Sequence, residues 1–66
     1  MTNDNPFIRI KQVQYQTGLG RSTIYKLMAA GDFPFPVKLT PKSSAWVFSD
    51  VENWKLSRME DRKFIH

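Results

Sequence analysis

The sequence predicts a mainly α-helical fold that carries three helices and a small β-hairpin. Three observations lead to this prediction. Gly18–Gly20 interrupts two stretches of helical periodicity, and the two prolines within residues 32–36 exclude helix there. Further along, Ser49–Glu52 has the pattern of a helix start. The predicted order is arm, helix, turn, helix, proline corner, hairpin and helix, which is the order of a winged helix-turn-helix domain.

The N-terminal part is expected to contain a flexible leader, a short extended segment and a weak helix. Residues 1–6 are polar and end in a proline. Phe7–Ile10 alternates apolar and basic residues, which is typical of a short strand or an extended arm. Lys11–Thr17 lacks a good N-cap residue, whereas Gly18 and Gly20 stop the helical pattern clearly.

The second helix, Arg21–Ala30, is the better marked of the two. Gly20 is an acceptable N-cap residue, and Gly31 suits the left-handed position that follows a helix C-terminus. Its apolar residues lie at i, i+3 and i+4 on one face, namely Ile24, Leu27 and Met28. This face is therefore expected to pack on the core.

A β-hairpin is predicted after the proline corner. Val37–Leu39 and Ala45–Phe48 resemble two strands, and the polar segment Thr40–Ser44 joins them as a turn. Phe33 and Phe35 are expected to pack beneath the proline corner. The hairpin is expected to add four apolar side chains to the core: Val37, Leu39, Trp46 and Phe48.

The last helix is expected to extend from about Asp50 to Arg62. The side chain of Ser49 can accept from the backbone N–H of Glu52, while Glu52 reaches back to the N–H of Ser49. The acidic residue Asp50 also suits the positive end of the helix dipole. Trp54 and the tryptophan of the hairpin could stack on bases, but both lie among apolar residues, which favours core packing.

Composition limits the class of protein. A chain of 66 residues is predicted to form one domain over its whole length, with residues 63–66 as a frayed tail. There is no cysteine, and the single histidine is His66, so we expect no disulfide, no metal site and no cofactor. An enzyme is disfavoured, because no convergent carboxylate pair is present either. Neither a membrane-spanning run nor a signal peptide is found, which predicts a cytoplasmic protein.

Positive charge is concentrated in the first part of the chain. The formal net charge is +4. Residues 1–48 hold six basic and two acidic side chains, whereas residues 49–66 hold four of each. This distribution favours a polyanionic partner, although a well-solvated basic surface would have the same composition.

The second helix offers a surface for such a partner. Opposite its apolar face, a helical wheel places Ser22, Tyr25, Lys26 and Ala29, with Arg21 at the N-terminal edge of this side. Arg21 and Lys26 can contact guanine edges or phosphates. Ser22 and Thr23 lie in the first turn, where hydroxyl and backbone N–H groups can bind phosphate oxygens. The Tyr25 hydroxyl can donate to a phosphate, but the same residues would also suit an ordinary solvated helix.

Two further elements carry candidate contacts. Lys42 in the hairpin turn and Lys38 on a strand can reach a phosphate backbone or a minor groove, or can simply keep the hairpin soluble and protect its edge. Leu56, Met59 and Lys63 lie on the side of the last helix away from the core. They are either scattered surface residues or a contact for another protein.

Five parts of the chain together resemble the AlpA-like prophage regulators and excisionases, over about residues 8–60. They are Val13, Thr17–Tyr25, Gly31–Leu39, Trp46 and Ser49–Trp54. The resemblance implies a MerR-like winged helix that binds short, often repeated, DNA sites. One departure is Gly20, where the family more often has a serine N-cap, and this weakens the helix start only slightly.

The resemblance also implies roles for individual residues. The recognition-helix segment matches Arg21, Ser22, Thr23, Tyr25 and Lys26, and the wing tip matches Lys42. The function that follows is a sequence-specific DNA-binding protein, either an excisionase that acts beside a phage integrase or a transcriptional regulator. With so few contacts, it is expected to be a monomer that binds adjacent sites on double-stranded DNA cooperatively. The alternative is a protein-binding inhibitor or adaptor that docks its last helix on a transcription factor, such as a response regulator.

Overall fold

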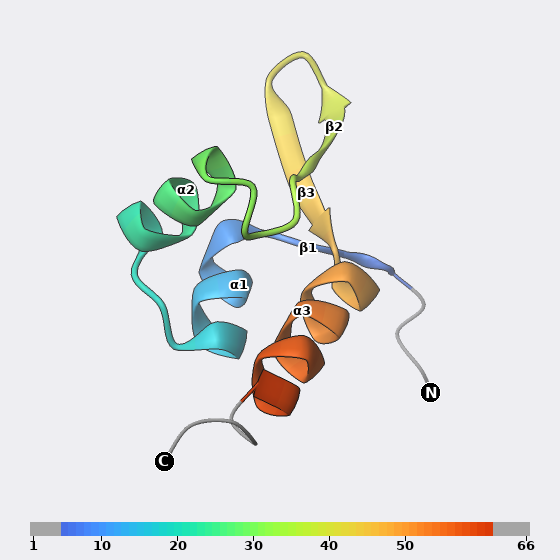
Figure 1. The fold of residues 1–66 in the computed structure, drawn as a ribbon. Helices are drawn as coiled ribbons and strands as arrows, with labels where there is room; N and C mark the ends of the chain where they lie inside the picture. Colours follow the sequence, from blue (N-terminus) through green and yellow to red (C-terminus); the bar gives the residue numbers. More distant parts are fainter. Residues whose placement is uncertain (1–4, 62–66) are drawn as a thin grey trace.

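The computed structural model describes residues 5–61 and confirms the winged helix-turn-helix arrangement (Figure 1). In chain order the elements are β1 (Phe7–Ile8), α1 (Ile10–Thr17), α2 (Arg21–Ala29), β2 (Val37–Thr40), β3 (Ser43–Val47) and α3 (Phe48–Asp61). Most of the predicted leader, the predicted tail and Lys63 lie outside the described residues. Among residues 5–61, no helix is long and apolar enough to cross a bilayer.

Glycine sets the turn between α1 and α2. Gly18 has a φ of 73°, a left-handed conformation that other residues adopt only with strain, and its N–H donates to the Gln14 carbonyl at 2.8 Å. The Thr17 hydroxyl donates to the Val13 carbonyl at 2.8 Å and accepts from the Leu19 N–H at 3.3 Å. No side chain caps the start of α1. The predicted weak beginning and sharp end of this helix are therefore confirmed, with its start one residue earlier.

The C-terminus of α2 also follows the prediction, although the helix ends one residue earlier. Gly31 has a φ of 79°, and its N–H donates to the Met28 carbonyl at 2.9 Å. The N–H of Asp32 donates to the Leu27 carbonyl at 2.8 Å. These bonds satisfy carbonyls that the helix leaves open, as in a Schellman-type cap, and they direct the chain toward the proline corner.

The three strands form an antiparallel sheet in the order β1-β3-β2. Phe7 pairs with Val47 and Ile8 with Trp46, so the predicted extended segment is a strand of the sheet. The register between β2 and β3 shifts near Lys38, which introduces an irregularity into the hairpin. Figure 1 shows this hairpin projecting beyond the helices at the end of the molecule where α2 lies.

The predicted capping box of α3 is wrong. The helix begins at Phe48, two residues before the predicted start, so Ser49 lies inside its first turn and cannot be the N-cap. The physical reason is tertiary: β3 leads directly into α3, and the Phe48 N–H is bound by the Pro6 carbonyl at 2.6 Å. The Glu52 carboxylate instead pairs with the Lys55 ammonium at 2.9 Å.

A small core joins all the helices to the sheet. Its buried residues are Ile8, Val13, Ile24, Phe33, Trp46 and Val51. Trp46 is only 2% exposed, and its indole N–H donates to the Pro34 carbonyl at 3.0 Å. The half-buried Trp54 packs edge-on against Phe33 with 4.8 Å between ring centroids. Both tryptophans thus pack as predicted.

Four apolar residues that were expected to pack inside are exposed instead. Val37, Leu39 and Phe48 retain 41%, 39% and 40% of their accessible surface. The hairpin extends past the body of the domain, so no layer covers this part of it, and Phe48 belongs to α3 rather than to the strand. Only Phe33 finds a place beneath the proline corner, whereas Phe35 is 64% exposed.

Candidate nucleic-acid interface

The outer face of α2 is open to solvent. Ile24, at 0% exposure, anchors the helix in the core, and Leu27 and Met28 are partly buried against it. The five predicted contact residues are all exposed: Arg21, Ser22, Thr23, Tyr25 and Lys26. The helix has no acidic residue of its own. The fold therefore presents a polar and cationic helix face of the kind that DNA-reading helices use.

The N-terminus of α2 is available to an anion. Gly20 is the N-cap residue and has no side chain to accept from the helix. The first bond of the helix runs from the Ile24 N–H to the Gly20 carbonyl at 3.1 Å. Because the preceding N–H groups have no partner within a helix, they can donate to phosphate oxygens. The hydroxyls of Ser22 and Thr23 lie in the same turn.

Tyr25 is the predicted contact residue most closely tied to the core. It is 44% exposed, and its ring lies 6.4 Å from that of Trp46 with an angle of 56° between the planes. The Trp46 ring is in turn fixed by its hydrogen bond to Pro34. Packing against the buried Trp46 indole restricts the movement of the Tyr25 ring, while the exposed part of the side chain remains available to a partner.

The hairpin contributes a second set of cations. Lys38 lies on β2 and Lys42 in the turn, and both are exposed. The Lys42 backbone N–H donates to the Thr40 hydroxyl at 3.2 Å, which stabilises the turn. Figure 1 shows α2 and the hairpin tip at the same end of the molecule, so the elements that carry these lysines and the predicted contact residues of α2 lie toward one end.

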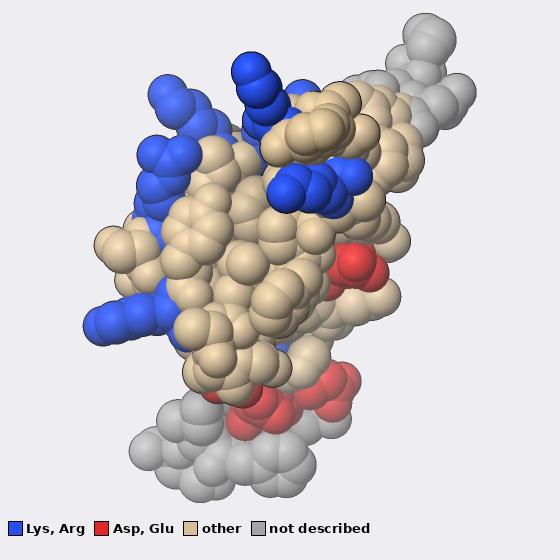
Figure 2. Space-filling view, turned by 90° about the horizontal axis from the view of Figure 1, so that it is seen from above, with Lys and Arg blue, Asp and Glu red and all other residues tan. Residues whose placement is uncertain are grey.

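Charge is distributed unequally between this surface and α3. Residues 5–47 contain six basic side chains and one acidic side chain, whereas α3 contains two basic and four acidic ones. Seen from the end that bears α2 and the hairpin, lysine and arginine side chains project along the left and upper parts of the face, and acidic side chains lie at its lower and right-hand edge (Figure 2). This separation gives the molecule a cationic end.

Sequence reasoning did not single out Arg9 as a contact residue. It lies between β1 and α1, is exposed, and its Nη1 donates to the Ser44 carbonyl of the hairpin at 3.1 Å. The partners are 35 positions apart in the chain, so only the pairing of β1 with β3 could have revealed their proximity. Arg9 thus adds an exposed cation beside the hairpin.

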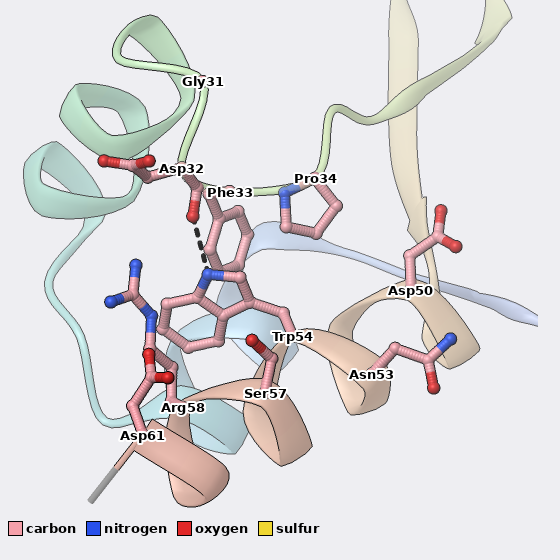
Figure 3. Close-up of a pocket in the computed structure, with 10 residues that line it drawn as sticks. All are labelled: Gly31, Asp32, Phe33, Pro34, Asp50, Asn53, Trp54, Ser57, Arg58 and Asp61. Carbon is pink, nitrogen blue, oxygen red and sulfur yellow. Dashed lines mark hydrogen bonds between the residues drawn. The ribbon is translucent and has the colours of Figure 1, made fainter. Parts of the chain in front are cut away.

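An open cleft of about 630 Å³ lies away from the cationic surface, between residues 31–34 and α3 (Figure 3). The Trp54 indole N–H donates to the Asp32 carbonyl at 2.6 Å, and the Arg58 guanidinium lies 5.0 Å from the centroid of the same indole ring. Asp50 and Asp61 also line the cleft. Its mixed charges distinguish it from the surface on α2.

The two predicted protein-contact residues lie apart from that surface. Leu56 and Met59, three residues apart on α3, are 55% and 48% exposed. The core contact of this helix is made by Val51 and Trp54. The structure therefore separates two groups of candidate residues, one on α2 and the hairpin and one on α3.

Two helices joined at a left-handed glycine, followed by a projecting hairpin and a third helix, define a protein of the winged helix-turn-helix class. Comparison with known families agrees: the family described as "Prophage CP4-57 regulatory protein (AlpA)" matches residues 6–59. The chain therefore belongs to the AlpA family of prophage regulatory proteins. The resemblance read from the sequence is thereby confirmed.

One relative comes from a bacteriophage. Over 57 residues, the chain is 44% identical to the uncharacterized protein ORF88 of Enterobacteria phage P4. The match covers 86% of this chain and 65% of the length of the phage protein. The chain thus spans about two thirds of that relative.

Proposed function

We propose that this protein is a sequence-specific DNA-binding regulator of a prophage, with α2 in the major groove and the hairpin against the adjacent backbone. The main support is the open cationic face of α2, which lies at the same end of the molecule as the hairpin. A major groove about 12 Å wide admits a single helix. Membership of a prophage regulatory family agrees with this role, which requires neither a catalytic group nor a cofactor.

Each contact residue has a chemical role in this proposal. Arg21 and Lys26 donate to guanine edges or to phosphates. Ser22 and Thr23, together with the N–H groups of the first turn, bind a phosphate. The Tyr25 hydroxyl donates to the backbone. These contacts combine positioning on the duplex with reading of a few bases.

The hairpin lysines extend the footprint. Lys42 in the turn meets the phosphates that border the groove, and Lys38 adds a second cation on β2. Neither contact reads a base, so both raise affinity for any DNA sequence. Specificity in this proposal comes from α2.

The length of α2 limits the length of the DNA site that one copy of the protein can read. A helix of nine residues is about 13 Å long and covers roughly four base pairs. One copy therefore reads a short site, which favours cooperative binding of monomers to adjacent sites. Such binding in the cytoplasm suits an excisionase that directs a phage integrase, as well as a regulator of transcription.

Binding should depend steeply on salt. Each phosphate contact contributes about −0.9 to the slope of log Kobs against log salt, so a handful of contacts gives a slope of about −3 to −5. The measurement is fluorescence anisotropy with a duplex from the prophage attachment region and a mixed-sequence duplex of equal length. A flat salt response on both duplexes would contradict the proposal, and tighter binding to the attachment duplex would support its sequence specificity.

The exposed pair on α3 supports a second activity, contact with another protein. Leu56 and Met59 lie three residues apart and form an apolar patch on a helix that carries more acidic than basic residues. Because this patch is on a different element from the cationic surface, DNA and protein can be bound together. The partner in this proposal is the phage integrase, and the alternative partner is a response regulator.

Leu56→Ser combined with Met59→Ser tests the protein contact. We expect unchanged affinity for DNA alone, since α2 and the hairpin are not altered, but loss of excision in cells that carry the prophage and its integrase. Tyr15→Ser is the matched control, because Tyr15 is 87% exposed on α1. Normal excision by the double variant would contradict a role for this patch with integrase, and co-purification with a response regulator would then test the alternative.

A further inference from the structure

Arg9 connects the beginning of the chain to the hairpin. Its backbone is extended, with φ −93° and ψ 170°, and it occupies the N-cap position of α1 without a side-chain cap bond. The side chain is exposed and reaches the Ser44 carbonyl through Nη1 at 3.1 Å. A basic residue at this position is therefore directed along the sheet rather than onto its own helix.

The sheet explains why the guanidinium lies there. β1 pairs with β3 only at Val47 and Trp46, because the chain enters α1 at Ile10. A longer β1 would continue along the same edge of β3 toward Ser44. The guanidinium reaches this edge instead and supplies a donor where the strand has ended. Arg9 thus ties the part of β3 next to the hairpin turn to the body of the domain.

The local charges leave Arg9 able to bind an external anion. A guanidinium carries five N–H donors, and the bond to Ser44 uses one of them. Ser44 pairs across the hairpin with Lys38, so two basic residues flank this position. The sequence from residue 5 to residue 47 contains a single carboxylate, that of Asp32. A phosphate would therefore meet little competition from acidic groups along these elements.

We propose that Arg9 holds the hairpin in position against the body of the domain and, with its remaining donors, binds a DNA phosphate beside the hairpin. The second part rests on the proposed DNA-binding function. A planar guanidinium suits both tasks, because its donors diverge in a fixed geometry and can serve two acceptors at once. Arg9 is thus both a positioning residue for the hairpin and a contact residue.

Arg9→Gln tests both parts, with Lys11→Gln as the matched control, since Lys11 is exposed, lies two residues away and loses the same charge. We expect Arg9→Gln to reduce the magnitude of the salt slope by about one on both duplexes. We also expect lower {1H}-15N NOE values for the hairpin amides of residues 40–44. Lys11→Gln should change neither quantity. Arg9→Lys should keep the salt slope but not the hairpin order, because an ammonium group lacks the planar fork.

Three results would overturn parts of the proposal. Equal effects of Arg9→Gln and Lys11→Gln would mean that Arg9 acts only through its share of the protein's net positive charge, and not through a specific contact. A changed hairpin with an unchanged salt slope would refute the phosphate contact. An unchanged hairpin would refute the positioning role. If the unaltered protein shows no salt-dependent DNA binding, the proposed function fails, while the NOE measurement still decides whether Arg9 positions the hairpin.

Discussion

Replacing Trp46 with alanine is expected to lower the free energy of unfolding by about 3 to 5 kcal/mol. The indole is 2% exposed, lies in the core cluster with Val13 and Ile24, and donates to the Pro34 carbonyl. Its loss would leave a cavity and an unpaired carbonyl in a domain with a small core. Since small domains have little stability to spare, most of the protein should be unfolded. Urea denaturation followed by circular dichroism measures this change.

Two further variants help to interpret the loss of stability. One removes the hydrogen bond of Trp46 but keeps most of its volume, and the other removes an exposed aromatic ring as a control. Trp46→Phe keeps most of the apolar volume and loses the hydrogen bond to Pro34, so we expect a smaller loss of about 1 to 2 kcal/mol. Tyr15→Ala removes a large aromatic side chain that is 87% exposed and should change stability by less than about 0.5 kcal/mol. If Trp46→Ala unfolded at the same urea concentration as Tyr15→Ala, Trp46 would not be a main support of the core.

Local features of the sequence predicted the helix-turn-helix well. Gly18 and Gly31 both take the left-handed conformation that their positions after a helix required. The apolar spacing of α2 placed Ile24 in the core and left the opposite side exposed. Such features depend on a few neighbouring residues, so they can be read without knowledge of the rest of the fold.

Features that depend on contacts between distant segments were predicted less well. A capping box at Ser49 was reasonable locally, but the strand that precedes α3 runs directly into the helix and moves its start to Phe48. The alternating pattern of the hairpin suggested a buried face for Val37 and Leu39. It contained no information on how far the hairpin projects beyond the core.

The candidate site also divides into residues that could be predicted from their neighbours in the chain and a residue whose position depends on a distant segment. The residues on α2 were predicted as exposed because a helical wheel needs only one buried face, and the structure places them so. Arg9 was missed because its partner, Ser44, lies 35 positions away and becomes adjacent only through the sheet. Whether each of these residues contacts DNA remains a prediction for the experiments described above.

Arg21→Ala combined with Lys26→Ala is expected to weaken specific DNA binding by about thirtyfold or more. Each lost base or phosphate contact costs about 1 to 3 kcal/mol, and 1.4 kcal/mol corresponds to a factor of ten. The measurement is anisotropy on the attachment duplex at fixed salt. Circular dichroism should show an unchanged fold, because both side chains are exposed and alanine favours helix.

The matched control is Lys55→Ala combined with Arg58→Ala, which removes the same charge from α3. These cations already have partners in the protein. The Lys55 ammonium lies 2.9 Å from both a Glu52 carboxylate oxygen and the Gln16 side-chain oxygen, and the Arg58 guanidinium lies over the Trp54 ring. We therefore expect only a small loss of affinity. Equal losses of affinity from the two pairs would mean that net charge alone attracts DNA. If α2 reads the groove, removing two cations from α2 must weaken binding more than removing two cations from α3.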